Sequence, residues 1–487
     1  MSSNYYVIGE ISSDVGRVLV GTLHKGRLTI SEARRFSTEA TVEKGTVQWN
    51  IPQIYQEVMT GLQEIGVYEE PVDGISFTGP GADYLLFEAD GSLQTPTFHA
   101  MDPRGESGMK EVLTRIPAET LYEETGLQLL PTNTLSQLAS EKPKRLKRAN
   151  LILPIADAFH YLLSGVPRVE MSSASTTQLF NPVTRNWSER ILADLKIPAK
   201  PFAPLVPAGT KLGQVRSDVV NSPRLQEAQV IAGCSLELSS MLAGLPVEHG
   251  ENWAWLRCGV ASTIGTSLIG PIICDASHEL GFNNFMGYGG AVHFSRQVVG
   301  LSILEECKRY WKEKDRELYD DVLSHLATSA EPFESLINPE DPRFLSPGDM
   351  PLKIQAFCKE TNQAVPRKPG PILRCVLESL ALHYRKVLLE IEALTGRQFS
   401  KLYLFGAADQ GLLHHFIANA LQIPVVLAPP ESTGIGNAAI QALALGHIKS
   451  IDEAREIIRN SFKTETITPH AAVWNAAYDR LSELVPS

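Results

Sequence analysis

The stretch YYVIGEISSDVGRVLVGTLHKGRLTISEARRF, residues 5–36, decides the fold class. Tyr6–Ile8 is a short β run, Arg17–Leu23 is a second, and a turn at Lys25-Gly26 precedes a third. Short β-rich runs separated by turn residues are typical of antiparallel strands. The chain is therefore predicted to open with a strand meander.

A helix and a buried strand are predicted to follow this meander. Residues 51–66, IPQIYQEVMTGLQEIG, have helical spacing of their apolar side chains, which are Ile51, Ile54, Val58, Leu62 and Ile65. Residues 72–79, VDGISFTG, then read as a buried strand. Strand hairpins followed by alternating helix and strand imply an α/β domain.

A second α/β set is predicted after residue 250. Residues 252–270 are β-rich, residues 369–395 form a long helix that ends at Gly396, and residues 401–428 read as strand, turn, helix and strand. We place the boundary near Leu245-Pro246, which gives domains 1–246 and 247–487. Two such lobes normally bind a ligand in the cleft between them.

Composition restricts the classes of function. The chain has 487 residues and a net charge of −11, and no basic run marks a nucleic-acid or membrane surface. Its six cysteines form no CxxC pair, which favours reduced thiols. The N-terminus lacks the features of a signal peptide and no apolar run is long enough to span a membrane, so we expect a cytoplasmic protein with small-molecule ligands.

Several loops have side chains suited to ligands, although each also has a plain structural explanation. Residues 9–18, GEISSDVGRV, could hold phosphate oxygens or form an ordinary hairpin turn. Residues 405–413 and 428–446 place small residues where strand meets helix, which suits a nucleotide or tight packing. His414 and His415 lie on a predicted helix, where we expect them at the surface.

Two further loops carry polar groups at predicted strand ends. Asp83 follows a Gly-Pro-Gly turn, and Asp102 and Arg104 lie in the stretch HAMDPRG. A polyol ligand needs paired donors and acceptors of this kind. The alternative is an ordinary solvated loop.

Residues 230–246, VIAGCSLELSSMLAGLP, read as a strand end, a turn of small residues and a helix. Such turns often hold a catalytic side chain. The candidates here are Cys234, Ser235 and Glu237.

These pieces, in this order, resemble the FGGY carbohydrate kinases of the actin/hexokinase superfamily, and within that family the rhamnulokinase branch. The matching segments cover nearly the whole chain, and they are VGRVLVG (15–21), GADYLLFEADG (81–91), LLPTNTLSQLAS (129–140), the 154–191 block, the 337–361 block and ESTGIGNAAIQ (431–441). The resemblance implies two actin-like (ribonuclease-H-like) α/β lobes with an interlobe cleft. It also implies transfer of the ATP γ-phosphoryl group to a ketose hydroxyl, with Mg²⁺ as the metal and an Asp as the base.

The chain departs from the family pattern at the phosphate segments. The family's metal-linked Asp falls on Glu10, and Asp14 would place negative charge beside phosphate. The Gly-Thr pair of the second phosphate loop is shifted to Gly265 and Thr266, or lost. The residues expected at the nucleotide are Ser13, Asp14, Gly16, Arg17, Gly265, Thr266, Glu305, Gly406, Ala407 and Gln410.

The sugar side departs as well. Gln297 takes the place of a sugar-contacting Asn. At the nucleotide, Phe405 puts a side chain where the adenosine loop of the family has none. The residues expected at the sugar are Gly81, Asp83, Asp102, Arg104, Cys234, Ser235 and Gln297.

The base position is the largest departure. The family's His and Asp fall on Cys234 and Ser235 when the match is anchored on the left, and the Asp falls on Leu236 when it is anchored on the right. A serine hydroxyl is far too weak a base near pH 7, so Glu237 is the nearby carboxylate that could serve. Two residues along a helix turn a side chain by about 200°, which could instead aim Glu237 away.

Two hypotheses therefore stay open. The chain is an ATP-dependent ketose kinase that uses Glu237 or a water in place of the usual base, or it is a pseudokinase that binds sugar or nucleotide as a sensor or partner. Under either one we expect a monomer or a small homo-oligomer.

Overall fold

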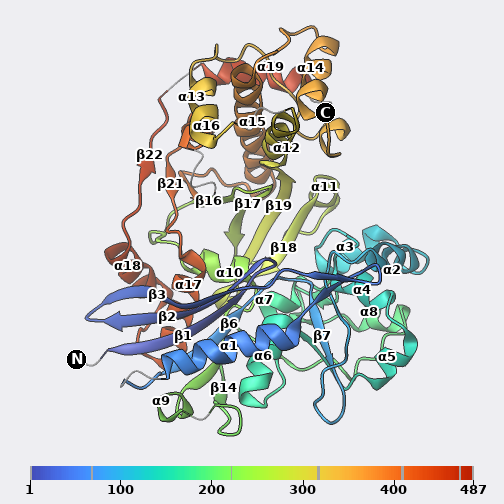
Figure 1. Cartoon of the computed structure of the whole chain (residues 1–487), viewed down its shortest axis with the longest axis vertical. Helices are drawn as coiled ribbons and strands as arrows, with labels where there is room; N and C mark the ends of the chain where they lie inside the picture. The colour runs from blue at the N-terminus through green and yellow to red at the C-terminus, as the bar shows by residue number, and fades with distance from the viewer. Residues whose placement is uncertain are drawn as a thin grey trace. The chain divides into compact units, whose positions relative to one another are not determined.

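The computed structural model describes residues 3–66, 70–220, 222–314, 318–406, 411–470 and 473–484. The chain divides into two compact units, which are drawn in Figure 1. Unit 1 comprises Met1–His249, Leu268–Phe294 and Glu431–Lys463, and unit 2 comprises Gly250–Ser267, Ser295–Pro430 and Thr464–Ser487. The division expected at residue 246 thus differs from these units, because two later segments return to unit 1.

Unit 1 is built on a six-stranded sheet of order β14-β15-β6-β1-β2-β3. The strands are β1 (Asn4–Ile11), β2 (Val15–His24), β3 (Arg27–Ser37), β6 (Gly74–Thr78), β14 (Thr210–Gln214) and β15 (Gln229–Ala232). Strands β1 to β3 are antiparallel neighbours, which confirms the predicted meander. Strands β6 and β15 instead run parallel to β1.

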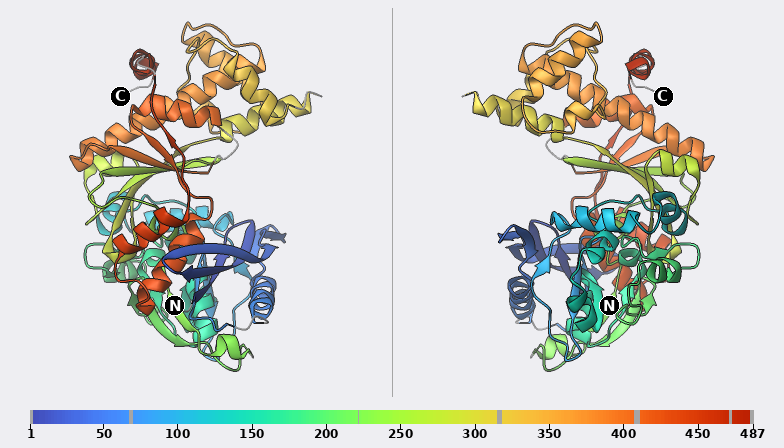
Figure 2. Two further views of the ribbon diagram at one scale, coloured as in Figure 1. Left: turned by 90° about the vertical axis from the view of Figure 1, so that its left-hand side faces the viewer. Right: turned by 90° about the vertical axis from the view of Figure 1, so that its right-hand side faces the viewer.

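Helices cover both faces of this sheet, as Figures 1 and 2 show. Helices α1 (Ile51–Ile65) and α6 (Ile155–Ser164) pack on the face that carries Val7 and Phe77. Helices α17 (Ser432–Leu445) and α18 (Ile451–Ser461) pack on the opposite face, against Tyr6 and Ile8. This apolar packing is the reason that residues 431–463 belong to unit 1.

Smaller elements complete unit 1. They are β4 (Thr41–Glu43), β5 (Thr46–Trp49), β7 (Tyr84–Phe87), β8 (Thr97–Phe98), α2 (Arg104–Leu113), α3 (Ala118–Thr125), α4 (Thr134–Ala139), α5 (Pro143–Arg148), β9 (Leu151–Pro154), β10 (Val169–Glu170), α7 (Met171–Ala174), β11 (Phe180–Asn181), β12 (Asn186–Trp187), α8 (Glu189–Asp194), β13 (Leu205–Val206), α9 (Pro223–Gln226), α10 (Glu237–Ala243), α11 (Asp275–Glu279) and β18 (Phe282–Met286).

A second sheet, of order β18-β19-β17-β16-β20-β21-β22, includes the strands of unit 2, while its strand β18 belongs to unit 1. Its further strands and the helices of unit 2 are β16 (Trp253–Arg257), β17 (Ala261–Leu268), β19 (Val292–Val299), β20 (Lys401–Phe405), β21 (Val425–Leu427), β22 (Thr466–Ile467), α12 (Ser302–Glu313), α13 (Asp320–Thr328), α14 (Met350–Glu360), α15 (Pro369–Thr395), α16 (Gly411–Leu421) and α19 (Trp474–Leu484). Helix α15 ends at Gly396, as predicted, with that glycine at φ +65°.

One expectation for unit 2 is wrong. His414 was expected at the surface, but its side chain is buried on α16. The helix packs against α15 and α19. In the described parts of the chain, every helix is too short or too polar to cross a bilayer.

Candidate functional site

The candidate site lies where three parallel strands of unit 1 end. Because β1, β6 and β15 run parallel, their carboxyl ends meet at one edge of the sheet. Ligands of open α/β sheets bind beyond such ends. Glu10 lies next to the end of β1, Gly79 follows β6, and the turn that holds Ser235 follows β15.

Glu10 and Arg17 form an ion pair at this edge. They stand directly opposite each other in the β1–β2 ladder, which brings their side chains together on the α17 face. Arg17 Nε and Nη2 donate to Glu10 Oε2 at 2.9 and 2.5 Å. Arg17 Nη1 also lies 2.8 Å from Oε2 of Glu431, the residue before α17. The guanidinium that was expected at phosphate is therefore held between two carboxylates.

Glu10 is a buried carboxylate with a shifted pKa. Burial raises the pKa of Glu10 to about 7, the Arg17 guanidinium opposes that rise, and the Glu237 and Glu431 carboxylates add to it. Glu10 Oε1 has no hydrogen-bond partner within the described chain.

The three candidate residues of the turn after β15 have different surroundings. Cys234 is fully buried against Ala243 and Ile440, and burial raises the pKa of its thiol. Ser235 is buried too, and its hydroxyl donates to Asp157 Oδ1 at 2.8 Å. Glu237, half-buried, is the first residue of α10. Of the three, Glu237 is the one whose charge adds to the raised pKa of Glu10.

The hairpin residues before Arg17 have less contact with this site. Ser13 and Asp14 are exposed at the β1–β2 turn, where Asp14 O accepts a hydrogen bond from Thr38 N at 3.1 Å. Gly16 lies opposite Phe36, whose ring would come within 2.1 Å of an added Cβ. That glycine is thus required by cross-strand packing.

The residues expected at the sugar are engaged within the protein. Asp83 is buried, and its Oδ1 accepts from Trp49 Nε1 and Ala100 N, each at 2.7 Å. Asp102 accepts from Val47 N at 2.6 Å and from Arg104 N at 2.9 Å.

Arg104 and Gly81 complete this group. Arg104 Nη1 lies 3.0 Å from Glu141 Oε1, and its guanidinium covers the Phe98 ring. A Cβ at Gly81 would lie 2.9 Å from Thr176 Cγ2. These contacts give the acidic and basic side chains a structural role within unit 1. The alternative of an ordinary solvated loop did not predict this role, because it places these side chains in water.

Unit 2 holds the other residues expected at the nucleotide, and also Gln297, which was expected at the sugar. Thr266 is buried in β17 and donates to Trp253 O at 2.9 Å, while its neighbour Gly265 stands opposite Trp255 in the ladder. Gln297 is exposed on β19, and exposed Glu305 on α12 accepts from Lys308 at 3.0 Å.

The loop after β20 is described only in part. Gly406 adopts φ +74°, and an added Cβ would lie 2.3 Å from Cys258 O, so glycine is required there. Phe405, expected to narrow the adenosine loop, is buried in β20 instead. Ala407 and Gln410 lie outside the described residues.

The Glu10 carboxylate has the donor type that Mg²⁺ prefers. Among the described residues, no three His, Cys, Asp or Glu side chains are grouped so that they could hold a metal ion. Mg²⁺ in phosphoryl-transfer sites is usually held by one or two carboxylates plus substrate phosphates, and keeps several waters. The unpartnered Glu10 Oε1 would supply one ligand of this kind.

Three functional candidates were missed at the level of sequence. Glu431 was quoted only as the start of a matching segment, and Asp157 and Glu170 lie inside the 154–191 block. An acidic residue directly before a small-residue helix was the available signal for Glu431. No local signal marks Asp157 and Glu170, since their roles depend on contacts with Ser235.

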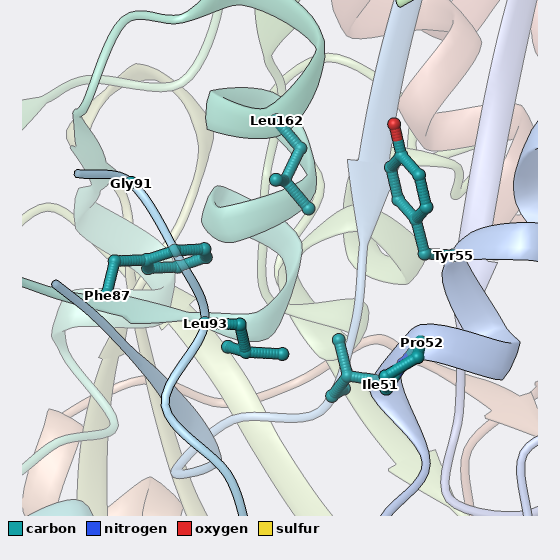
Figure 3. Close-up of a pocket in the computed structure, with 7 residues that line it drawn as sticks. All are labelled: Ile51, Pro52, Tyr55, Phe87, Gly91, Leu93 and Leu162. Carbon is teal, nitrogen blue, oxygen red and sulfur yellow. The ribbon is translucent and has the colours of Figure 1, made fainter.

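The chain also has a separate apolar pocket in unit 1, of about 180 Å³. Figure 3 shows its lining, which comes from α1, β7, the loop after β7 and α6. None of the expected site residues lines it.

Comparison with known proteins gives consistent matches over the whole chain. Two family models match, described as the FGGY family of carbohydrate kinases, N-terminal domain, over residues 13–243, and the C-terminal domain of that family, over residues 272–445. A rhamnulokinase of Bacteroides thetaiotaomicron is 32% identical over 483 residues, which cover 98% of each chain. A rhamnulokinase of Bacillus subtilis is 29% identical, covering 95% of each chain.

Solved structures share the fold. A ligand-bound xylulose kinase from Lactobacillus acidophilus superposes with a TM-score of 0.82 at 14% identity, covering 99% of this chain and 97% of that one. A glycerol kinase of Plasmodium falciparum with ADP gives 0.81 at 14% identity, covering 99% of each. The two-domain α/β fold expected from the sequence is thereby confirmed.

Proposed function

The chain belongs to the FGGY family of carbohydrate kinases, and we propose that it transfers the γ-phosphoryl group of ATP to a hydroxyl of a ketose, with L-rhamnulose as the first candidate. Family membership supports the kinase activity, and the similarity to rhamnulokinases supports the choice of sugar. The observation that carries the residue assignment is the position of Glu237 at the start of α10, where its N–H donates to Gly79 O at 3.0 Å beyond the end of β6. Its charge also adds to the raised pKa of Glu10.

In this proposal Glu237 is the general base. Its carboxylate accepts the proton of the attacking sugar hydroxyl while that oxygen bonds to the γ-phosphorus and the bond to the bridging oxygen breaks, which releases ADP. Glu10 would hold Mg²⁺, which when bound neutralises phosphate charge. Arg17 would turn from its carboxylate partners toward the phosphates.

The first experiment measures ADP release from Mg·ATP with a panel of L-rhamnulose, L-fuculose and xylulose. We expect turnover with at least one sugar and a kcat for Glu237→Gln that is lower by about 10²–10⁴-fold, because a positioned base contributes an effect of that size. Glu119→Gln is the matched control. Glu119 is also an acidic residue in the first turn of a helix, but its side chain is exposed on α3.

Two results would contradict the proposal in different ways. An unchanged kcat in Glu237→Gln, with an active wild type, would remove Glu237 as the base. No turnover of any sugar by the wild type would remove the ketose kinase activity.

One observation favours a second candidate function, binding without transfer. Arg17 is already paired with Glu10 and Glu431, so a phosphate must displace two carboxylates to reach it. A sugar that raises the melting temperature of the protein without any ADP release would support a sensor or partner subunit of this kind.

A further inference from the structure

Each polar group of Ser235 forms a hydrogen bond with another residue. Its N–H donates to Glu170 Oε2 at 2.9 Å, and its hydroxyl donates to Asp157 Oδ1 at 2.8 Å. Its carbonyl accepts from Gly79 N, also at 2.9 Å. A residue bonded in this way has a fixed position, because moving it would leave buried polar groups unpaired.

The two carboxylates that hold Ser235 are fully enclosed by protein. Asp157 and Glu170 are each 1% exposed, and they come from different elements, α6 and β10. Asp157 Oδ1 also accepts from Glu170 N at 3.2 Å, and its Oδ2 accepts from the Ser173 hydroxyl. Glu170 Oε1 accepts from Ser172 N at 2.9 Å. The result is one continuous hydrogen-bonded cluster.

His160 is the titratable group that faces this cluster from α6. Its Nε2 accepts from Phe77 N at 2.8 Å, so the ring proton is on Nδ1, which lies 3.6 Å from Asp157 Oδ1. His160 therefore joins α6 to β6 beside the cluster.

The same cluster sets the start of α10. Leu236 N donates to Ser172 Oγ at 3.0 Å, and Glu237 N donates to Gly79 O at 3.0 Å. Two successive N–H groups are thus fixed at the start of the helix. The backbone of Glu237 therefore has little freedom, and its charge adds to the raised pKa of Glu10.

We propose that Asp157 and Glu170 are positioning residues for phosphoryl transfer, which hold Ser235 and thereby aim the Glu237 carboxylate at the reacting hydroxyl. This inference rests on the proposed function of Glu237. It gives Ser235 a role different from that of a base: the residue anchors the turn from which the base projects.

The cost of burying this cluster supports the proposal. Two carboxylates in an apolar interior are expensive unless each is well hydrogen-bonded, and uncharged side chains would close a turn at lower cost. Burial raises the pKa of Glu170 to about 8, which also reflects the free-energy penalty of burying its charged form. Buried carboxylates with shifted pKa values are common at functional sites.

Ser235→Ala tests the proposal because it removes only the hydroxyl bond to Asp157. We expect kcat to fall about 10- to 100-fold, since small misplacements of a reacting group cost this much, while KM for ATP stays within about twofold. Amide hydrogen exchange of residues 234–238 is expected to accelerate in the same variant. The control is Ser136→Ala, because Ser136 is equally buried and its hydroxyl donates to Leu130 O at 2.8 Å, away from the turn.

The outcomes separate the inference from the proposed function. If the wild type and Ser136→Ala turn over a ketose and Ser235→Ala does so equally well, the positioning role is wrong while the kinase activity stands. Unchanged exchange at residues 234–238 in Ser235→Ala would also overturn the positioning role, whatever the activity. A wild type without turnover would overturn the function on which the inference rests.

Discussion

Ser235 lies between two buried carboxylates. These carboxylates determine how a charge added at residue 235 affects the stability of the protein. The family resemblance, anchored on the left, puts the catalytic Asp at this position. In the structure the Ser235 hydroxyl and N–H already bind Asp157 and Glu170. A carboxylate at residue 235 would be the third in one water-free cluster.

We therefore predict that Ser235→Asp destabilises the protein and does not raise kcat. Like charges at hydrogen-bond distance in a buried site cost on the order of 3 kcal/mol or more, the size of other uncompensated buried charges. Urea unfolding near pH 7 would measure the loss, and ADP release would measure kcat.

Ser235→Asn is the control for this substitution, since it adds similar volume without charge. It should lose less stability than Ser235→Asp, and the difference should shrink below pH 5. A Ser235→Asp variant that folds and has a higher kcat than the wild type would contradict this prediction and indicate that position 235 is the site of the general base.

Helices α10 and α17 meet backbone to backbone, and this contact joins the candidate site to the sheet. A Cβ added at Gly436 would lie 1.8 Å from Ser240 O, and one added at Gly244 would lie 2.0 Å from Ser432 O. Glycine on each helix allows an approach that any side chain would prevent. The contact sets where α17, with Glu431 before it, reaches Glu10.

We predict that Gly436→Ala destabilises unit 1 by about 3 kcal/mol or more, because the obstructing atoms are backbone and cannot rotate away. It should also lower kcat, since the α10–α17 contact supports both Glu237 and Glu431. Urea unfolding and ADP release would check the two effects.

Gly411→Ala is the matched control, because Gly411 begins helix α16 and no atom lies within 4 Å of its added Cβ. Alanine there should be neutral or slightly stabilising through helix propensity. Equal stability of the two variants would mean that the helices can separate without cost.

These elements also show what the sequence could predict. The meander, the end of α15 at Gly396 and the strand–turn–helix at residues 230–246 follow from local periodicity and turn residues, and the structure has all three. The partners of Ser235 do not follow, because Asp157 and Glu170 are 78 and 65 residues away. Burial of His414 was missed for the same reason: a tertiary contact, rather than local polarity, decides it.

For the molecule as a whole, buried carboxylates link folding to pH. Burial raises the pKa of Glu170 from its ordinary 4.5 to about 8 and that of Glu10 to about 7. The folded protein therefore holds protons that the unfolded chain releases. The stability due to these protons is complete below about pH 4.5 and is lost as pH rises through 7 and 8. The net charge of −11 adds repulsion in the same direction.

We predict that Glu170→Gln makes the stability of the protein less sensitive to pH. The amide resembles the protonated carboxyl and does not ionise, so the variant avoids a loss on the order of a few kcal/mol between pH 5 and 9. Urea midpoints at pH 5, 7 and 9 would show a smaller fall than in the wild type. Glu119→Gln, which removes one exposed carboxylate and the same charge, should retain the slope of the wild type. Parallel slopes for all three proteins would mean that Glu170 ionises freely in the fold, and the buried cluster around Ser235 would then be open to water.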